Sequence, residues 1–200
     1  MAAKLGPPAG FASRRLLIHR EKVGRLWRRL YQTRHPDPLG SRPAHSRFSH
    51  PSGTAFGVVY LGSSVKVAFH EVILRDRADA RSGAVLIPYA ELEAYTCAEI
   101  IAVSELRLVD LTGDAPLKMG VPSDVAGARD QTLARQWSAA FHTHPDRVDG
   151  VYYPSRLNEE RNIALYDRAL AKLTVRATSR LLDLRDPLTQ IIEDFQLEVR

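Results

Sequence analysis

The chain has 200 residues, a formal net charge of +5 and a single cysteine, Cys97. One cysteine excludes an intrachain disulfide and a thiolate zinc cluster, and no apolar run is long enough to cross a membrane, so we expect a cytoplasmic protein without a membrane partner. The excess of 28 basic over 23 acidic side chains gives either a solvated basic face or a surface that attracts a polyanion, such as nucleic acid, a nucleotide pyrophosphate or an acidic protein.

No linker-like composition divides the chain, so we predict a flexible tail over residues 1–15 and a single domain over residues 16–200. The segment from Leu16 to Tyr31 mixes apolar and basic side chains and predicts a helix or a strand. Prolines at positions 36, 38 and 43 then impose an irregular loop through His45. Binding an anion through flanking arginines is one reason for such a loop to be ordered.

The stretch from residue 46 to residue 74 predicts a loop, a strand, a turn and a helix. Residues 56–61 form an apolar run rich in β-formers, and apolar residues recur at helical spacing over 65–73. Arg47 lies in the loop, Tyr60 near the strand end and Glu71 on the helix, just off its apolar stripe. Glu71 can therefore sit at the rim of a cleft, although a solvated helix residue and a half-buried strand tyrosine would fit the same spacing.

The remainder of the chain predicts many short strands and a few helices. A long helix is expected to begin near Ser123 or Asp124 and to end around His144, and residues 76–83 form a turn. The last residues, 187–200, suit either a strand or a helix. Strands are expected over residues 84–87, 95–103, 106–111, 148–153 and 162–166. This pattern predicts an α+β fold built on mixed or antiparallel sheets.

Several common catalytic patterns are absent from the sequence. Neither type of glycine-rich phosphate loop and no nucleophile-elbow motif occurs. His142, His144 and Asp146 imitate metal ligands, but residues two apart on a helix face different directions, so we predict no metal site. Ser155 taken alone is a turn residue within a Pro-Ser-Arg sequence.

Five residues in their local sequences resemble the RES domain family, which is named for arginine, glutamate and serine. The resemblance extends from about Trp27 to Asp167, and Arg28 and Arg34 compete with Arg29 for the first family position. The matching segments are Arg29 in RRLYQTRHPDPLG, Arg47 in SRFSHP, Tyr60 in FGVVYLG, Glu71 in AFHEVIL and Ser155 in GVYYPSRLNEERNIALYDRA.

The resemblance implies an ADP-ribosyltransferase-like fold and a toxin of a bacterial toxin-antitoxin pair. Such proteins deplete NAD by cleaving its nicotinamide glycosidic bond, by hydrolysis or phosphorolysis, and transfer of ADP-ribose to a protein is the alternative. NAD is then a substrate and no cofactor or metal is needed. A helix-turn-helix antitoxin is expected to block the cleft, and a homodimer is compatible with the family.

The resemblance also assigns roles. Glu71, Tyr60 and Arg47 are the predicted catalytic residues, with the Glu71 carboxylate stabilising the oxocarbenium character that develops on the ribose. Arg29 and Arg47 would bind the pyrophosphate, Tyr60 would pack against or orient a ring, and Ser155 would hydrogen-bond the nicotinamide amide or the ribose. Two other classes stay open: a non-enzymatic module that binds nucleic acid through the basic N-terminal segment, and an inactive regulatory protein.

Overall fold

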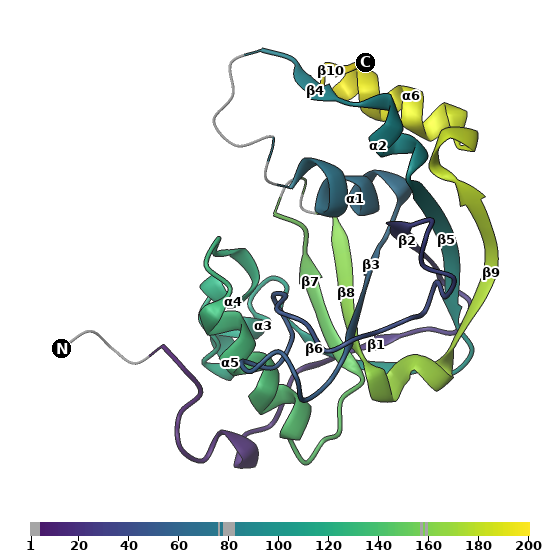
Figure 1. The fold of residues 1–200 in the computed structure, drawn as a ribbon. Helices are drawn as coiled ribbons and strands as arrows, with labels where there is room; N and C mark the ends of the chain where they lie inside the picture. The colour runs from purple at the N-terminus through teal and green to yellow at the C-terminus, as the bar shows by residue number, and fades with distance from the viewer. Residues whose placement is uncertain (1–4, 76, 78–82, 157, 159) are drawn as a thin grey trace.

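An eight-stranded sheet dominates the structure, a computed structural model that describes residues 5–75, 77, 83–156, 158 and 160–200 (Figure 1). The strand order is β1-β6-β7-β8-β3-β2-β5-β9; β6 and β7 run parallel, and every other neighbouring pair is antiparallel. Its strands are β1 (Ile18–Glu21), β2 (Leu26–Gln32), β3 (Val58–Gly62), β5 (Tyr95–Ala102), β6 (Leu106–Asp110), β7 (Gly150–Pro154), β8 (Arg161–Tyr166) and β9 (Leu173–Arg180). The predicted α+β class with a mixed sheet is confirmed.

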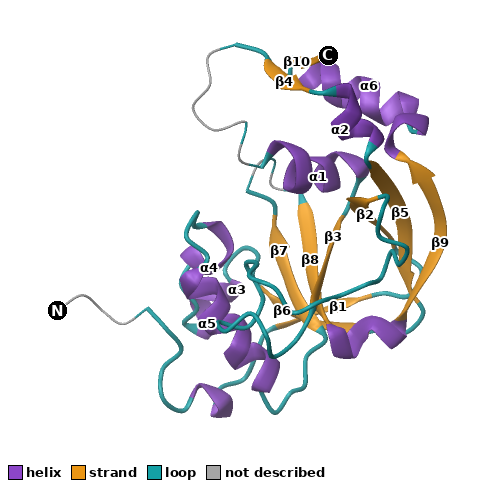
Figure 2. Cartoon of the chain, in the orientation of Figure 1, coloured by secondary structure: helices purple, strands orange, loops and turns teal. Residues whose placement is uncertain are grey.

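Short helices lie outside this sheet, and β4 (Val85–Ile87) pairs in parallel with β10 (Leu197–Val199) beside them (Figure 2). In the described part of the chain, no helix has the length and apolarity needed to cross a bilayer. The α-helices are α1 (Val65–Phe69), α2 (Tyr89–Glu93), α3 (Ala115–Met119), α4 (Asp124–Gly127), α5 (Thr132–Thr143) and α6 (Arg185–Asp194). The shorter helical segments are η1 (Phe11–Ser13), η2 (His70–Leu74), η3 (Asp167–Lys172) and η4 (Leu181–Asp183), of which η2 is π-helical.

The strand predictions over residues 56–61, 84–87, 95–103, 106–111, 148–153 and 162–166 are confirmed as β3 to β8. The segment Leu16–Tyr31 forms two strands, β1 and β2, separated by a turn in which Gly24 has φ +84°. The helix predicted from residue 124 to residue 144 is wrong as one helix. It breaks between α4 and α5, where Ala128 is extended and the Asp130 carboxylate accepts a hydrogen bond from the Thr132 N–H at 2.8 Å. An aspartate that bonds nearby backbone in this way competes with helix continuation.

Both ends of the chain pack against the domain. In the segment predicted as a tail, residues 1–15, the Phe11 ring is buried edge-on against Trp137 at 4.9 Å, and Trp137 Nε1 donates to the Leu5 carbonyl at 2.8 Å. At the other end, residues 187–200 form both of the predicted alternatives, the greater part of α6 followed by β10. The predicted turn at 76–83 falls largely outside the described residues.

The sheet curls around an interior apolar cluster. This cluster joins residues from β2 and β5 at one end of the strand order with residues from β6 at the other, which requires the two halves of the sheet to face each other. Two further clusters cover the outer surface: one under α4 and α5, and one under α1, η2 and α6. Members of the interior cluster include Trp27, Leu61, Ala98, Ile100, Leu108, Tyr152 and Ile163. The outer face between the two helical layers is where side chains of β3, β7 and β8 become available to a ligand.

His70, the first residue of η2, is fully buried, and neither of its ring nitrogens has a hydrogen-bond partner in the described part of the chain. Its ring meets Phe195 edge-on at 4.4 Å, and the charged groups that act on it are Lys66, Glu160 and Asp194. Burial, reinforced by Lys66, lowers the pKa of His70 to about 4. His70 therefore takes up a proton near pH 6.5 in the unfolded chain but only near pH 4 in the folded chain.

We expect this histidine to make the protein less stable as the pH falls from about 6.5 towards 4. Between pH 7.5 and pH 4.5 its contribution to the loss of unfolding free energy is roughly 2 kcal/mol. His70→Leu is expected to reduce the loss, measured by urea unfolding at both pH values. The reduction is partial, because burial also lowers the pKa of His142 to about 4. An equal pH dependence in wild type and His70→Leu would contradict the expectation, and exposed His35→Leu is the matched control.

Candidate active site

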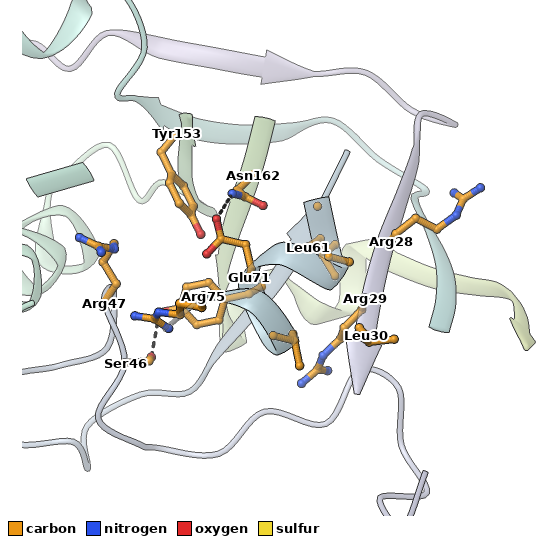
Figure 3. Close-up of a pocket in the computed structure, with 14 residues that line it drawn as sticks. Arg28, Arg29, Leu30, Ser46, Arg47, Leu61, Glu71, Arg75, Tyr153 and Asn162 are labelled. Atoms are coloured by element: carbon orange, nitrogen blue, oxygen red, sulfur yellow. Dashed lines mark hydrogen bonds between the residues drawn. The ribbon is translucent and has the colours of Figure 1, made fainter. Parts of the chain in front are cut away.

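Three neighbouring strands present polar side chains on the same outer face of the sheet. Val59 and Leu61 of β3 point into the interior cluster, so Tyr60 faces outward, and the same alternation turns Tyr153 of β7 and Asn162 of β8 outward. Asn162 is the register partner of Tyr153 on one side and of Gly62 on the other. The segment α1–η2 lies over this face, and a cavity of about 250 Å³ opens between them (Figure 3).

Gly62 permits the helix to approach the sheet this closely. A Cβ atom at this position would lie 2.9 Å from the Ala68 nitrogen and 2.9 Å from Val67 Cγ1. The helix itself begins at Ser64, whose Oγ accepts a hydrogen bond from the Val67 N–H at 3.1 Å. The close approach brings the π-helical turn η2, and Glu71 with it, to the cavity wall.

Glu71 projects from η2 into the cavity, at the rim position that the helical spacing predicted. Its Oε1 accepts hydrogen bonds from Asn162 Nδ2 at 2.9 Å and from Ser155 Oγ at 3.0 Å. Among the described residues, no donor bonds the second oxygen, Oε2. One oxygen is thus fixed by the protein while the other is left for a ligand, and π-helical turns of this kind are frequent at functional sites.

Tyr60 is held in one orientation by the loop that precedes β3. Its hydroxyl accepts a hydrogen bond from the Phe48 N–H at 2.8 Å and shares a second, at 2.8 Å, with Ser46 Oγ. Burial raises the pKa of Tyr60 above its usual value, so the phenol stays protonated at neutral pH. Tyr60 therefore offers its ring to the cavity and also ties down the loop that carries Arg47.

Arg47 is buried, with only 6% of its surface exposed, and none of the described residues hydrogen-bonds its Nη1. Burial lowers its pKa, while Tyr153 and Glu71 act in the opposite direction, and an arginine with its high usual pKa stays charged. A desolvated guanidinium with an unmet donor is costly unless a counter-charge arrives. The loop thus holds a cation in place for an anionic ligand.

The three arginines that compete for the first family position differ in their surroundings. Arg29 lines the cavity, but it donates to the carbonyls of Pro38 at 2.6 Å and Gly40 at 3.0 Å. Arg28 also lines it and pairs with Glu99 at 2.9 Å, whereas Arg34 is exposed and lies outside the lining. In Figure 3, Arg28 and Arg29 lie on the opposite side of Glu71 from Arg47.

Ser155 follows β7, is buried, and reaches the site through the carboxylate of Glu71. It is not among the residues that line the cavity. Four of the five predicted side chains line one cavity: Arg29, Arg47, Tyr60 and Glu71. The fifth, Ser155, hydrogen-bonds the Glu71 carboxylate.

Sequence reasoning gave no site role to Tyr153, Asn162 or Arg75. The hydroxyl of Tyr153 and the amide of Asn162 both point toward the Glu71 carboxylate (Figure 3). Burial raises the pKa of Tyr153 well above its usual value, and the Glu71 charge adds to the rise. A polar Asn162 between apolar neighbours in a strand, and Arg75 four residues after Glu71 on a helix, were the signals available in the sequence.

The lining carries four guanidinium groups and one carboxylate, Glu71, so it suits an anionic ligand. Among the described residues, no three histidine, cysteine, aspartate or glutamate side chains lie close enough to hold a metal ion. His142 instead stacks on Phe56 at 4.0 Å, and His144 Nε2 donates to the Arg14 carbonyl at 3.1 Å. The arrangement fits electrostatic catalysis on a phosphorylated substrate.

Comparison with known proteins places this site in a family. The profile of the RES domain matches residues 23–186. The chain belongs to the RES domain family. All five predicted site residues fall within the matched range, and the resemblance seen in the sequence is confirmed.

Two relatives of this RES-domain chain are informative. The "Probable toxin y4kH" of Sinorhizobium fredii (strain NBRC 101917 / NGR234) is 44% identical over 126 residues, which are 63% of this chain and 99% of that protein. A chain in the crystal structure of the M. tuberculosis MbcT-MbcA toxin-antitoxin complex superposes with a TM-score of 0.62 at 21% identity, over 89% of this chain and 98% of that one. At this identity the second likeness shows the fold alone.

Proposed function

We propose that this RES-domain protein is the toxin of a bacterial toxin-antitoxin pair and that it cleaves the nicotinamide glycosidic bond of NAD. The observation that carries the proposal is the Glu71 carboxylate, fixed by Ser155 and Asn162 beside Arg47, whose Nη1 has no partner among the described residues. Membership of the RES domain family and the name of the relative y4kH, a probable toxin, support the toxin role.

In the proposed reaction, the electron pair of the ribose C1″–N bond leaves with nicotinamide, which departs as a neutral base. Positive charge develops on the ribose, and the free oxygen of Glu71 stabilises it electrostatically. The oxygen of water, phosphate or a protein side chain then bonds C1″ and gives up its proton. Because the pyridinium already carries the positive charge, its departure needs no strong general acid. Arg47 binds the diphosphate and so places the ribose beside Glu71.

Purified protein incubated with NAD is expected to release free nicotinamide, and chromatography of the other product identifies the acceptor. ADP-ribose indicates hydrolysis, ADP-ribose 1″-phosphate formed only in phosphate buffer indicates phosphorolysis, and radiolabel retained on protein indicates transfer. No loss of NAD under any of these conditions would reject the proposed reaction. Salt-dependent retention on DNA without NAD loss would favour the nucleic-acid-binding alternative.

The proposed partner is an antitoxin that covers the cavity, and the family expectation is a helix-turn-helix protein. The MbcT structure comes from a toxin-antitoxin complex, which supports an antitoxin as the partner. The chain is basic overall, and the surplus of guanidinium groups in the cavity lining suits an acidic segment of such a partner. In the NAD assay, the partner protein is expected to stop nicotinamide release at equimolar concentration.

A further inference from the structure

Arg75 lies on the same side of the helical segment as Glu71. It follows η2 directly, four residues after Glu71, so about one helical turn separates the two side chains. Arg75 is half-buried and lines the cavity. In Figure 3 its side chain extends toward Ser46 and Arg47, on the side of Glu71 away from Arg28 and Arg29.

The guanidinium of Arg75 has no hydrogen-bond or ion-pair partner among the described residues. The arginines near it in the sequence and in the cavity lining do have partners: Arg77 makes two bonds of 2.9 Å to Glu91, and Arg28 pairs with Glu99. Arg29 donates to two backbone carbonyls, those of Pro38 and Gly40. Arg28 and Arg29 thus each have a protein partner, whereas the described residues provide none for the guanidinium of Arg75 and none for Nη1 of Arg47.

Cations gather at this end of the cavity without matching anions. Burial is the main cause of the lowered pKa of Arg47, and Tyr153 opposes it. The charges of Arg75 and Arg156 lower this pKa further, so each of them repels the Arg47 guanidinium. The one lining carboxylate, Glu71, already accepts two hydrogen bonds. Like charges held close in a partly desolvated site are stabilised by an anion that carries more than one negative charge.

We propose that Arg47 and Arg75 together form the clamp for the diphosphate of the substrate, and that Arg29 is a positioning residue. Two guanidinium forks that converge on one cavity match the oxygens of adjacent phosphates. Arg29, whose donors hold the carbonyls of Pro38 and Gly40, fixes the loop that borders the cavity. This inference rests on the proposed NAD reaction for its substrate, but it concerns binding and is testable without turnover.

The test is calorimetric titration of wild type, Arg75→Ala, Arg75→Lys and Arg29→Ala with three probes: ADP-ribose, nicotinamide riboside and inorganic phosphate. Arg75→Ala is expected to weaken ADP-ribose binding by about 10- to 100-fold, the loss of one charge-assisted bonding group. Arg75→Lys should restore part of this, because lysine keeps the charge without the fork. Binding of nicotinamide riboside, which has no phosphate, should stay within about twofold of wild type. Exposed Arg34→Ala is the matched control for loss of charge.

Arg29→Ala is expected to behave differently: its melting temperature falls, and it loses a similar factor of affinity for ADP-ribose and for nicotinamide riboside.

Three results would overturn the clamp. They are no ADP-ribose binding by wild type, an equal loss of affinity for ADP-ribose and nicotinamide riboside in Arg75→Ala, or a loss of affinity confined to inorganic phosphate. The last result would assign Arg75 to binding a free anion instead. The Arg75→Lys variant and melting curves separate a binding loss from misfolding. ADP-ribose binding that depends on Arg75 in a protein that leaves NAD intact would reject the reaction and keep the clamp. NAD cleavage that Arg75→Ala leaves unchanged would reject the clamp and keep the proposed reaction.

Discussion

Glu71→Gln is expected to lower the rate of NAD cleavage by at least about 100-fold while leaving the fold and the NAD affinity close to wild type. Glutamine retains an oxygen that can accept the hydrogen bonds of Ser155 and Asn162, so the side chain stays in place and only the negative charge is lost. The charge acts mainly on the oxocarbenium-like transition state, so the change appears in kcat more than in KM. Nicotinamide release and a melting curve measure both parts of this expectation.

Glu93→Gln removes an exposed carboxylate at the end of α2 and is the matched control, with unchanged turnover expected. Ser155→Ala keeps the charge of Glu71 but removes one of the two bonds that hold it, so a smaller loss of rate is expected. Near wild-type turnover by a folded Glu71→Gln protein would remove the carboxylate from the mechanism. It would leave the guanidinium groups as the main electrostatic feature of the site.

Local sequence patterns predicted most elements of this fold because the forces that make them are local. The apolar run of β-formers in β3, the alternation along β6 and the helical spacing of α1 all reflect burial, which neighbouring residues record. The strand order does not follow from such patterns, since β1 pairs with β6 and β3 with β8 across long stretches of chain. The break between α4 and α5 depends on a side-chain bond from Asp130 that competes with the helix, and this competition was not anticipated.

The site also has features that local sequence predicts and features that depend on the pairing of distant strands. Glu71 was placed at the rim of a cleft by its position beside an apolar stripe, and the family resemblance supplied Arg47, Tyr60 and Ser155. Tyr153 was not assigned to the site because only the pairing of β7 with β8, and of β8 with β3, shows which face of the strand meets the helix. A strand alternates in the same way whether its outward residues face solvent or a cavity.

Arg47→Met is expected to change binding and stability in opposite directions. Methionine keeps much of the volume of the side chain and removes a buried cation whose Nη1 has no partner. The free energy of unfolding should therefore rise by roughly 1–3 kcal/mol, since an uncompensated buried charge no longer has to be desolvated. The affinity for ADP-ribose should fall by about 10- to 100-fold, because the clamp loses one of its guanidinium groups.

Urea unfolding and calorimetric titration of the same protein give both quantities, and Arg34→Met, an exposed arginine outside the cavity lining, should change neither. A less stable Arg47→Met protein with unchanged ADP-ribose affinity would assign Arg47 to the architecture of the loop instead of the ligand. The opposite signs matter because a structural arginine stabilises the folded chain by itself. A cation held without a partner costs the empty protein stability, and that cost is offset when the anion binds.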